Sequence, residues 1–159
     1  MNYGDIKYPD IANGPGVRVS LFVSGCTHHC KGCFQPETWD FDYGQPFDQE
    51  AEDLIFRYLD SPYVAGLSLL GGEPFEPENC QVLADFVQRV KDLFPDKTVW
   101  AYSGYLFEEL LQRPDSCGLL ALVDILVDGE FVEEEKDITL VFRGSANQRL
   151  IDVKRALLV

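Results

Sequence analysis

The sequence predicts an α/β protein with an open partial (β/α) barrel of about five to six mainly parallel strands. Short apolar runs typical of buried strands alternate with segments of helical periodicity, which indicates repeated βαβ units. Glycine-rich or polar turns follow these runs. The chain has 159 residues, whereas a complete eight-fold barrel typically needs about 250. We therefore expect one domain, residues 1–159, built as an open partial barrel or a curved doubly wound sheet.

The first strand and helix follow a polar beginning. Residues 1–16 are rich in turn formers, and we expect a loop there. Residues 17–23 are β-branched and apolar, as in strands that are buried on both faces. Residues 34–46 again indicate a loop. Asp48 can then cap a helix, because the following apolar residues share one helical face: Ala51, Leu54, Ile55, Tyr58 and Leu59.

The middle of the chain contains the clearest βαβ unit. A strand is predicted over residues 66–70, and Pro77 suits the first turn of a helix that ends before Pro95. The apolar residues of that helix repeat at helical spacing. Another strand is expected over residues 98–102.

The last third gives weaker signals. We expect a short helix near residues 105–112 and a strand over residues 123–127. Residues 140–142 and 150–153 can each form a strand on either side of a turn-like segment. All turns that follow the parallel strands should meet at one rim of the sheet, where α/β proteins bind ligands.

The acidic charge of the chain indicates which classes of macromolecule it is expected to bind. The formal net charge is −14 at pH 7, which disfavours nucleic-acid backbones and anionic membranes. A macromolecular partner is therefore expected to be a protein. The beginning of the chain has no basic and apolar leader, and no apolar run is as long as a membrane span. We expect a cytoplasmic protein.

Three cysteines lie in one glycine-containing loop directly after the first predicted strand, namely Cys26, Cys30 and Cys33. Thiolates are soft ligands that bind iron–sulfur clusters, zinc or copper. A 4Fe-4S cluster usually takes four cysteines, so three would leave one iron open to another ligand. Clustered cysteines also differ from the dispersed pairs of a secreted disulfide scaffold. We therefore expect metal or redox chemistry in this loop.

Other interpretations of the loop are weaker. Structural zinc needs a fourth ligand, and His28 and His29 lie inside the loop, where ligation is sterically awkward. A thioredoxin-type pair of Cys30 and Cys33 would leave Cys26 without a role. The two histidines are most simply polar loop residues, one of which can shield or hydrogen-bond a cluster.

The remaining two cysteines are expected to be structural. Cys80 falls near the apolar face of the helix that begins at Pro77, and Cys117 falls in a predicted loop before a strand. Both are better explained as packing or incidental residues than as ligands.

A second motif, Gly71-Gly72-Glu73-Pro74, follows the predicted strand over residues 66–70. Because glycines have no side chain, backbone groups in such a turn can approach a ligand closely. The carboxylate of Glu73 can reach an ammonium group. Glycine turns at strand ends are common, so the motif is informative chiefly together with the cysteine loop.

The two motifs together resemble the radical S-adenosylmethionine (SAM) enzymes. Further segments resemble one family within them, the glycyl radical enzyme activases that serve the anaerobic ribonucleoside-triphosphate reductase. These segments cover essentially the whole chain: Asn13–Arg18, Leu21–Cys26, Gly32–Phe34, Glu37–Trp39, Val127–Phe131 and Arg143–Arg149.

The resemblance implies that Cys26, Cys30 and Cys33 hold a 4Fe-4S cluster and that SAM binds its open iron. It also implies SAM contacts from Gly71, Gly72 and Glu73. Many radical SAM proteins carry an aromatic residue just before the last cysteine, whereas this chain has Gly32 there and Phe34 just after. Backbone groups of Gly32, Cys33 and Phe34 are then the expected adenine contacts, and Ser103 and Asp128 can touch the ribose or a bound cation.

The activity implied by the resemblance is the activation of another enzyme. A one-electron donor such as flavodoxin would reduce the cluster, and SAM would be cleaved to methionine and a 5′-deoxyadenosyl radical. This radical would take a hydrogen atom from a glycine of the large catalytic subunit of the reductase. The alternatives are an activase for another glycyl radical enzyme, such as pyruvate formate-lyase, or a noncatalytic metal-binding or electron-transfer module.

Overall fold

A computed structural model describes residues 1–158 and has one seven-stranded sheet, in the order β3-β1-β2-β4-β5-β6-β7. Strands β2, β4, β5 and β6 run parallel, whereas β1, β3 and β7 are antiparallel to their neighbours. The sheet is open, with β3 and β7 at its edges. The strands are β1 (Asn2–Asp10), β2 (Val17–Val23), β3 (Gln45–Pro46), β4 (Val64–Gly71), β5 (Thr98–Ser103), β6 (Ile125–Asp128) and β7 (Arg149–Asp152).

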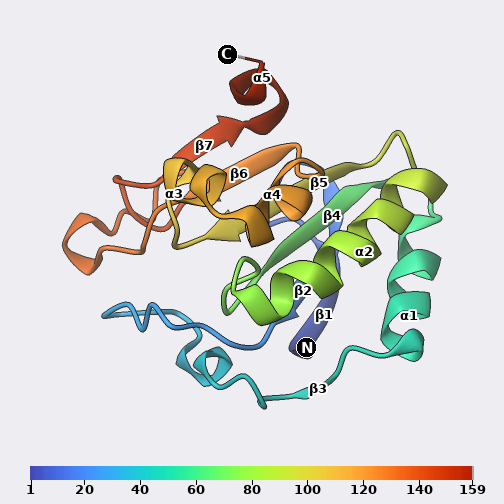
Figure 1. The fold of residues 1–159 in the computed structure, drawn as a ribbon, viewed down its shortest axis with the longest axis horizontal. Coiled ribbons are helices and arrows are strands. Elements are labelled where there is room, and N and C mark those ends of the chain that lie inside the picture. Colours follow the sequence, from blue (N-terminus) through green and yellow to red (C-terminus); the bar gives the residue numbers. More distant parts are fainter. Residues whose placement is uncertain (159) are drawn as a thin grey trace.

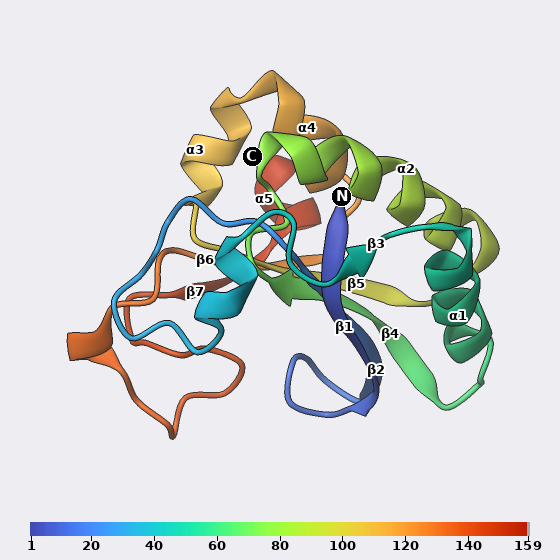
Figure 2. The same cartoon turned by 90° about the horizontal axis from the view of Figure 1, so that it is seen from below.

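The helices lie mainly on one side of this sheet. Figure 2 shows α2, α3 and α4 over one face, whereas long loops gather on the opposite side. Within residues 1–158, no helix has the length and apolar character that crossing a membrane requires. The α-helices, labelled in Figure 1, are α1 (Gln49–Leu59), α2 (Pro77–Leu93), α3 (Phe107–Gln112), α4 (Pro114–Leu120) and α5 (Val153–Leu157). Two short 3₁₀ helices are η1 (Pro36–Trp39) and η2 (Glu133–Glu135).

Local sequence signals explain where the two long helices begin. The side chain of Asp48 accepts a hydrogen bond from the backbone amide of Ala51, as an N-cap residue does. Helix α2 starts at Pro77, where the missing amide proton costs nothing because the first turn has no internal acceptor. Both predicted starts are confirmed.

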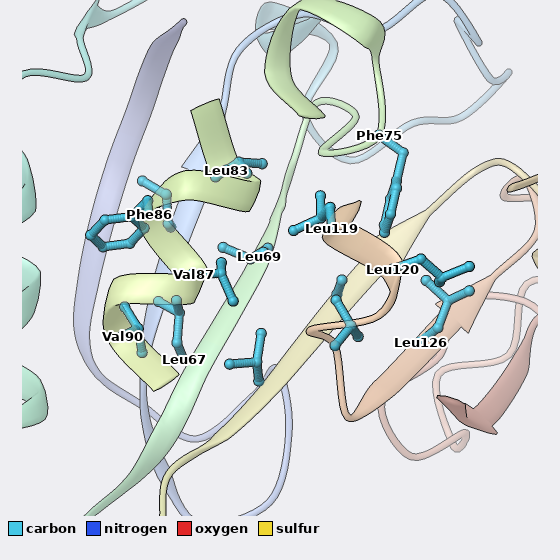
Figure 3. Packing of buried hydrophobic residues seen from close by; sticks show 14 of the residues in the cluster. Leu67, Leu69, Phe75, Leu83, Phe86, Val87, Val90, Leu119, Leu120 and Leu126 are labelled. Carbon is cyan, nitrogen blue, oxygen red and sulfur yellow. The ribbon is translucent and has the colours of Figure 1, made fainter. Parts of the chain in front are cut away.

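The hydrophobic core fills the space between the sheet and the helices. Because side chains alternate along a strand, Leu67 and Leu69 of β4 point toward α2. Figure 3 shows them packed beneath four residues of α2, namely Leu83, Phe86, Val87 and Val90. The intervening Ser68 points to the other face, where it meets Arg18 of β2. One face of β4 therefore builds the core, whereas its other face carries polar side chains.

The structure corrects several predictions about the elements. The sheet has seven strands rather than five to six, because the unpredicted strands β1 and β3 extend one edge of it. The predicted loop over residues 1–16 is wrong, since residues 2–10 form β1. This strand is polar because it lies near an edge and leaves most side chains half-buried or exposed, so its apolar pattern is weak. Part of the loop predicted over residues 34–46 forms η1 and β3.

The C-terminal third also differs from the prediction. Residues 140–142 form a bend rather than a strand, whereas the predicted strand near residues 150–153 is confirmed as β7. Cys117 lies in α4 and not in a loop. Pro114 begins this helix, and its short length conceals the helical period in the sequence.

Candidate functional site

A cavity of about 640 Å³ lies on the side of the sheet that the helices leave uncovered. Its size falls within the range of small-molecule and cofactor sites. Strand ends contribute Gly71, Gly72 and Ser103, and the loop over residues 129–148 contributes the outer wall. The expected meeting of several strand ends at one rim is therefore found.

All three cysteines of the motif line this cavity. Cys26, Cys30 and Cys33 are part of its wall, whereas Cys80 and Cys117 are not. Cys80 is buried in α2, and Cys117 is exposed in α4. The fold thus separates three thiols that share a cavity from two that do not.

The donor type of the three thiols fits an iron–sulfur cluster. Within residues 1–158, no three His, Cys, Asp or Glu side chains converge as a single-ion site requires. Thiolates that bind different irons of one cluster do not need to converge on one point, and sulfur is the donor that such clusters use. The donor set and the cavity are therefore compatible with a cluster held by Cys26, Cys30 and Cys33.

The surroundings of Cys26 and Cys30 favour the protonated form of these two thiols when no metal is bound. Burial raises the pKa of Cys26 to about 11, and burial also raises the pKa of Cys30. A bound metal ion deprotonates a coordinating thiol. Loading of the site is therefore expected to release protons.

Backbone hydrogen bonds fasten the glycine segment to the cysteine loop. The amide of Gly72 donates to the carbonyl of Val23 at 2.7 Å, and the amide of Glu73 donates to the carbonyl of Gly25 at 2.8 Å. Gly71 has φ of 105°, and a Cβ atom there would lie 2.7 Å from the backbone of Val23. The tight turn therefore requires glycine at position 71. The two motifs, far apart in the sequence, form one continuous wall.

The carboxylate of Glu73 is buried and surrounded by donors. Its Oε2 atom accepts from the Phe75 amide at 3.0 Å and from the Ser103 hydroxyl at 2.8 Å. Its Oε1 atom accepts from the Gly104 amide at 2.7 Å, and Nε2 of His28 lies 2.7 Å from the same atom. The side chain lines the cavity, but its orientation is set by the protein.

His28 lies between two carboxylates. Its Nδ1 atom is 3.0 Å from Oε1 of Glu130, while Nε2 faces Glu73. Ionised carboxylates only accept hydrogen bonds, so both ring nitrogens must carry protons to bond both partners. Burial lowers the pKa of His28, but hydrogen bonds and charge from Glu73 and Glu130 outweigh this effect and raise it to about 9.

A second buried carboxylate, that of Glu76, supports the base of the cysteine loop and was not predicted. Oε1 of Glu76 accepts from the hydroxyl of Thr27 at 3.0 Å and from the hydroxyl of Tyr105 at 2.8 Å. Burial, together with Glu76, raises the pKa of Tyr105 to about 12. No motif spacing links these residues, because they come from the cysteine loop, the start of α2 and the end of β5.

The residues on the two sides of Cys33 have different surroundings. Phe34 lines the cavity and is largely exposed, with its ring 5.0 Å from that of Phe131. Gly32 has φ of 76°, and a Cβ atom there would lie 3.0 Å from the side chain of Glu133. Gly32 therefore packs beside η2, whereas Cys33 and Phe34 face the cavity.

Ser103 and Asp128 occupy different environments although both end parallel strands. Ser103 lines the cavity, where its hydroxyl donates to Glu73. Asp128 is fully buried and accepts from the Phe107 amide at 2.8 Å and from Nε of Arg149 at 3.0 Å. Asp128 is thus engaged by the protein, and its neighbour Gly129 is the residue that reaches the cavity wall.

Comparison with known proteins gives a consistent family assignment. A family model described as a 4Fe-4S single cluster domain matches residues 12–151. A protein of Pasteurella multocida (strain Pm70) is 45% identical over 150 residues, which cover 93% of this chain and 95% of that protein. The corresponding protein of Escherichia coli (strain K12) is 42% identical, covering 93% and 96%.

A more distant relative carries the same name. The protein of Enterobacteria phage T4 is 40% identical over 150 residues, which cover 94% of this chain and 93% of that protein. All three relatives are named anaerobic ribonucleoside-triphosphate reductase-activating protein. The 4Fe-4S domain agrees with the cysteine chemistry of the cavity. The chain therefore belongs to the family of anaerobic ribonucleoside-triphosphate reductase-activating proteins.

Proposed function

We propose that this protein activates the anaerobic ribonucleoside-triphosphate reductase by reductive cleavage of SAM, and that it is a radical SAM enzyme. In this proposal its open sheet is a partial (β/α) barrel of the radical SAM type, formed by one domain over residues 1–159. The names of the relatives support the choice of reductase as partner over pyruvate formate-lyase.

One observation carries the proposal. Cys26, Cys30 and Cys33 share one cavity with Gly71, Gly72 and Glu73, and the other two cysteines of the chain lie elsewhere. Three thiolates would hold a 4Fe-4S cluster and leave one iron open. Because the glycine segment beside them has no side chains at positions 71 and 72, an amino acid such as the methionine part of SAM can come close to its backbone groups.

The cluster would supply the electron that breaks SAM into methionine and a 5′-deoxyadenosyl radical, which takes a hydrogen atom from a glycine of the reductase. The protein's own residues would bind the cluster and SAM and orient them. Glu73 is held in one orientation by four donors, so it fixes the shape of the segment that would hold the amino group of SAM. Cys33 and Phe34 line the expected adenine side of the cavity.

The uncovered side of the sheet suits a protein substrate. Helices α2, α3 and α4 cover one face, and loops together with the short helix η1 flank the cavity on the other. A peptide segment of the large reductase subunit can approach from this side, whereas a closed barrel would obstruct it. We place this reaction in the cytoplasm, with a one-electron donor such as flavodoxin.

Anaerobic reconstitution tests the proposal. The protein should bind about four irons per chain, and addition of a reductant and SAM should release 5′-deoxyadenosine and methionine. When the large reductase subunit is included, electron paramagnetic resonance should detect a glycyl radical. Tightly bound zinc without release of 5′-deoxyadenosine would contradict the radical SAM assignment. A glycyl radical on pyruvate formate-lyase but not on the reductase would contradict the partner.

A further inference from the structure

The His28 ring is held on several sides by segments that are far apart in the sequence. It bridges Glu73 and Glu130 through its two nitrogens, and only 8% of its side chain is exposed. The ring of Tyr105 meets it edge-on at 4.5 Å between centroids. Gly104 lies so close that a Cβ atom there would be 2.6 Å from the His28 ring. The ring therefore has little freedom to turn.

His28 completes the set of donors around Glu73. The other three donors are the amide of Phe75, the hydroxyl of Ser103 and the amide of Gly104. These come from the segment after Glu73 and from the end of β5, so His28 is the donor that the cysteine loop provides. A carboxylate has about four lone-pair sites. With all four used, the rotation of Glu73 is fixed.

We propose that His28 is a positioning residue. It acts through Glu73 to hold the cysteine loop and the Gly71–Glu73 segment in a fixed position relative to each other. The role rests on the proposed function, in which these two segments bind the cluster and SAM respectively.

The physical benefit is preorganisation. Glu73 is 1% exposed, and a buried carboxylate without a full set of donors would reorient to find other partners. When the position of Glu73 is already set, the segment that would bind the amino group of a ligand is ordered in advance, and the ordering cost of binding is lower. Mutation of residues that hydrogen-bond to a ligand-binding side chain in this way commonly lowers ligand affinity or activity by about 10- to 100-fold.

A double-mutant cycle on SAM binding tests the proposal. Reconstituted, oxidised protein is titrated with SAM by equilibrium dialysis, so that the dissociation constant is measured without turnover. His28→Ala should raise this constant about tenfold in the wild-type background. In a Glu73→Gln background the same change should have an effect of less than about twofold, because the residue that His28 positions is already lost.

A conservative variant and a neighbouring histidine provide controls. His28→Gln retains an amide donor for Glu73 and should bring the dissociation constant to within about threefold of the wild-type value. His29 belongs to the same loop but stacks on Trp39, with centroids 4.4 Å apart. Because His29 has φ of 51°, Asn is the suitable replacement. His29→Asn should leave the SAM dissociation constant within about twofold. Iron content is measured for every variant.

A readout without cofactors completes the test. In cluster-free protein, His28→Ala should lower the urea midpoint of unfolding in the wild-type background more than in the Glu73→Gln background. Equal effects of His28→Ala in both backgrounds, on binding and on unfolding, would overturn the positioning role. Failure of SAM to bind the wild-type protein would instead contradict the proposed function, and with it the role given to His28.

Discussion

The two faces of the sheet differ in chemistry although the same strands build both. Toward the helices, β4 presents Leu67 and Leu69, which are fully buried in the core. Toward the loops, it presents Ser68, whose hydroxyl accepts from Nε of Arg18 at 2.8 Å. The alternation of a strand thus separates a stabilising face from a face that carries polar groups and the cavity.

The comparison shows that stability and chemistry are largely assigned to different sides of one sheet. The helix side is apolar and closely packed, so changes there should act on the free energy of unfolding. The cavity side carries the three motif cysteines on a loop, so changes to them should act on the proposed function rather than on stability. Four predictions test this separation, in order of expected effect.

The largest effect is expected for Cys30→Ala. The loss of one cluster ligand should reduce 5′-deoxyadenosine release by more than about 100-fold, while the urea midpoint of the cluster-free protein stays close to wild type because Cys30 lies in a loop. Cys80→Ala is the control from the helix side, where the thiol is 1% exposed. It should cost stability and retain SAM cleavage. Equal loss of cleavage in both variants would contradict the ligand assignment.

Leu83→Ala should give the opposite pattern. Leu83 is fully buried on α2, and truncation of a buried leucine typically costs about 2–5 kcal/mol of unfolding free energy. Urea unfolding measures this loss, and the SAM dissociation constant of the folded variant should not change. Leu93→Ala, at the exposed end of the same helix, should change stability by less than about 0.5 kcal/mol. A weakened SAM affinity in Leu83→Ala would show that the two faces are coupled.

Arg18→Met examines a polar group of the cavity side that supports the fold. The guanidinium is fully buried, and its Nη2 atom donates to the carbonyls of Leu67 at 3.0 Å and Thr98 at 2.9 Å. Methionine keeps the stem but leaves these acceptors unpaired, so we expect a loss of about 2–4 kcal/mol in urea unfolding. The exposed Arg57 on α1 is the matched control. If Arg18→Met were as stable as wild type, the polar face would contribute nothing to folding.

Asp124→Asn should have the smallest effect and a defined pH dependence. Burial raises the pKa of Asp124, but hydrogen bonds from Lys91, the Val99 amide and Lys154 outweigh burial and lower it below its usual value. Such a carboxylate stabilises the fold above the pKa of the unfolded chain, and this contribution is lost as pH falls through the folded pKa.

The expected loss for Asp124→Asn is therefore about 1–2 kcal/mol at pH 7. The difference from wild type should shrink below about pH 4, where the unfolded carboxyl takes up its proton. Urea unfolding at several pH values measures it. A difference that stays constant down to about pH 2 would show that the ionised carboxylate is not the source of the stability.

Features with a strong local signal were predictable from the sequence alone. The strand Val17–Val23 has the predicted bounds, and α2 begins at Pro77 as predicted. Both depend on periodicity or on one terminal residue, which neighbouring side chains display without help from the rest of the fold. The cysteine loop and the glycine segment were recognisable for the same reason, since their spacing is local.

Only the tertiary structure decided which groups meet. Strand β1 is too polar to show a core pattern and forms because β2 offers it a partner. His28 lies 45 residues from Glu73 and 102 residues from Glu130 in the sequence, and no periodicity encodes such contacts. Asp128 is engaged by Arg149 across the β6–β7 pair. Local chemistry therefore determined the motifs, whereas the packing of strand ends determined their partners, because contacts between distant segments arise only when the sheet assembles.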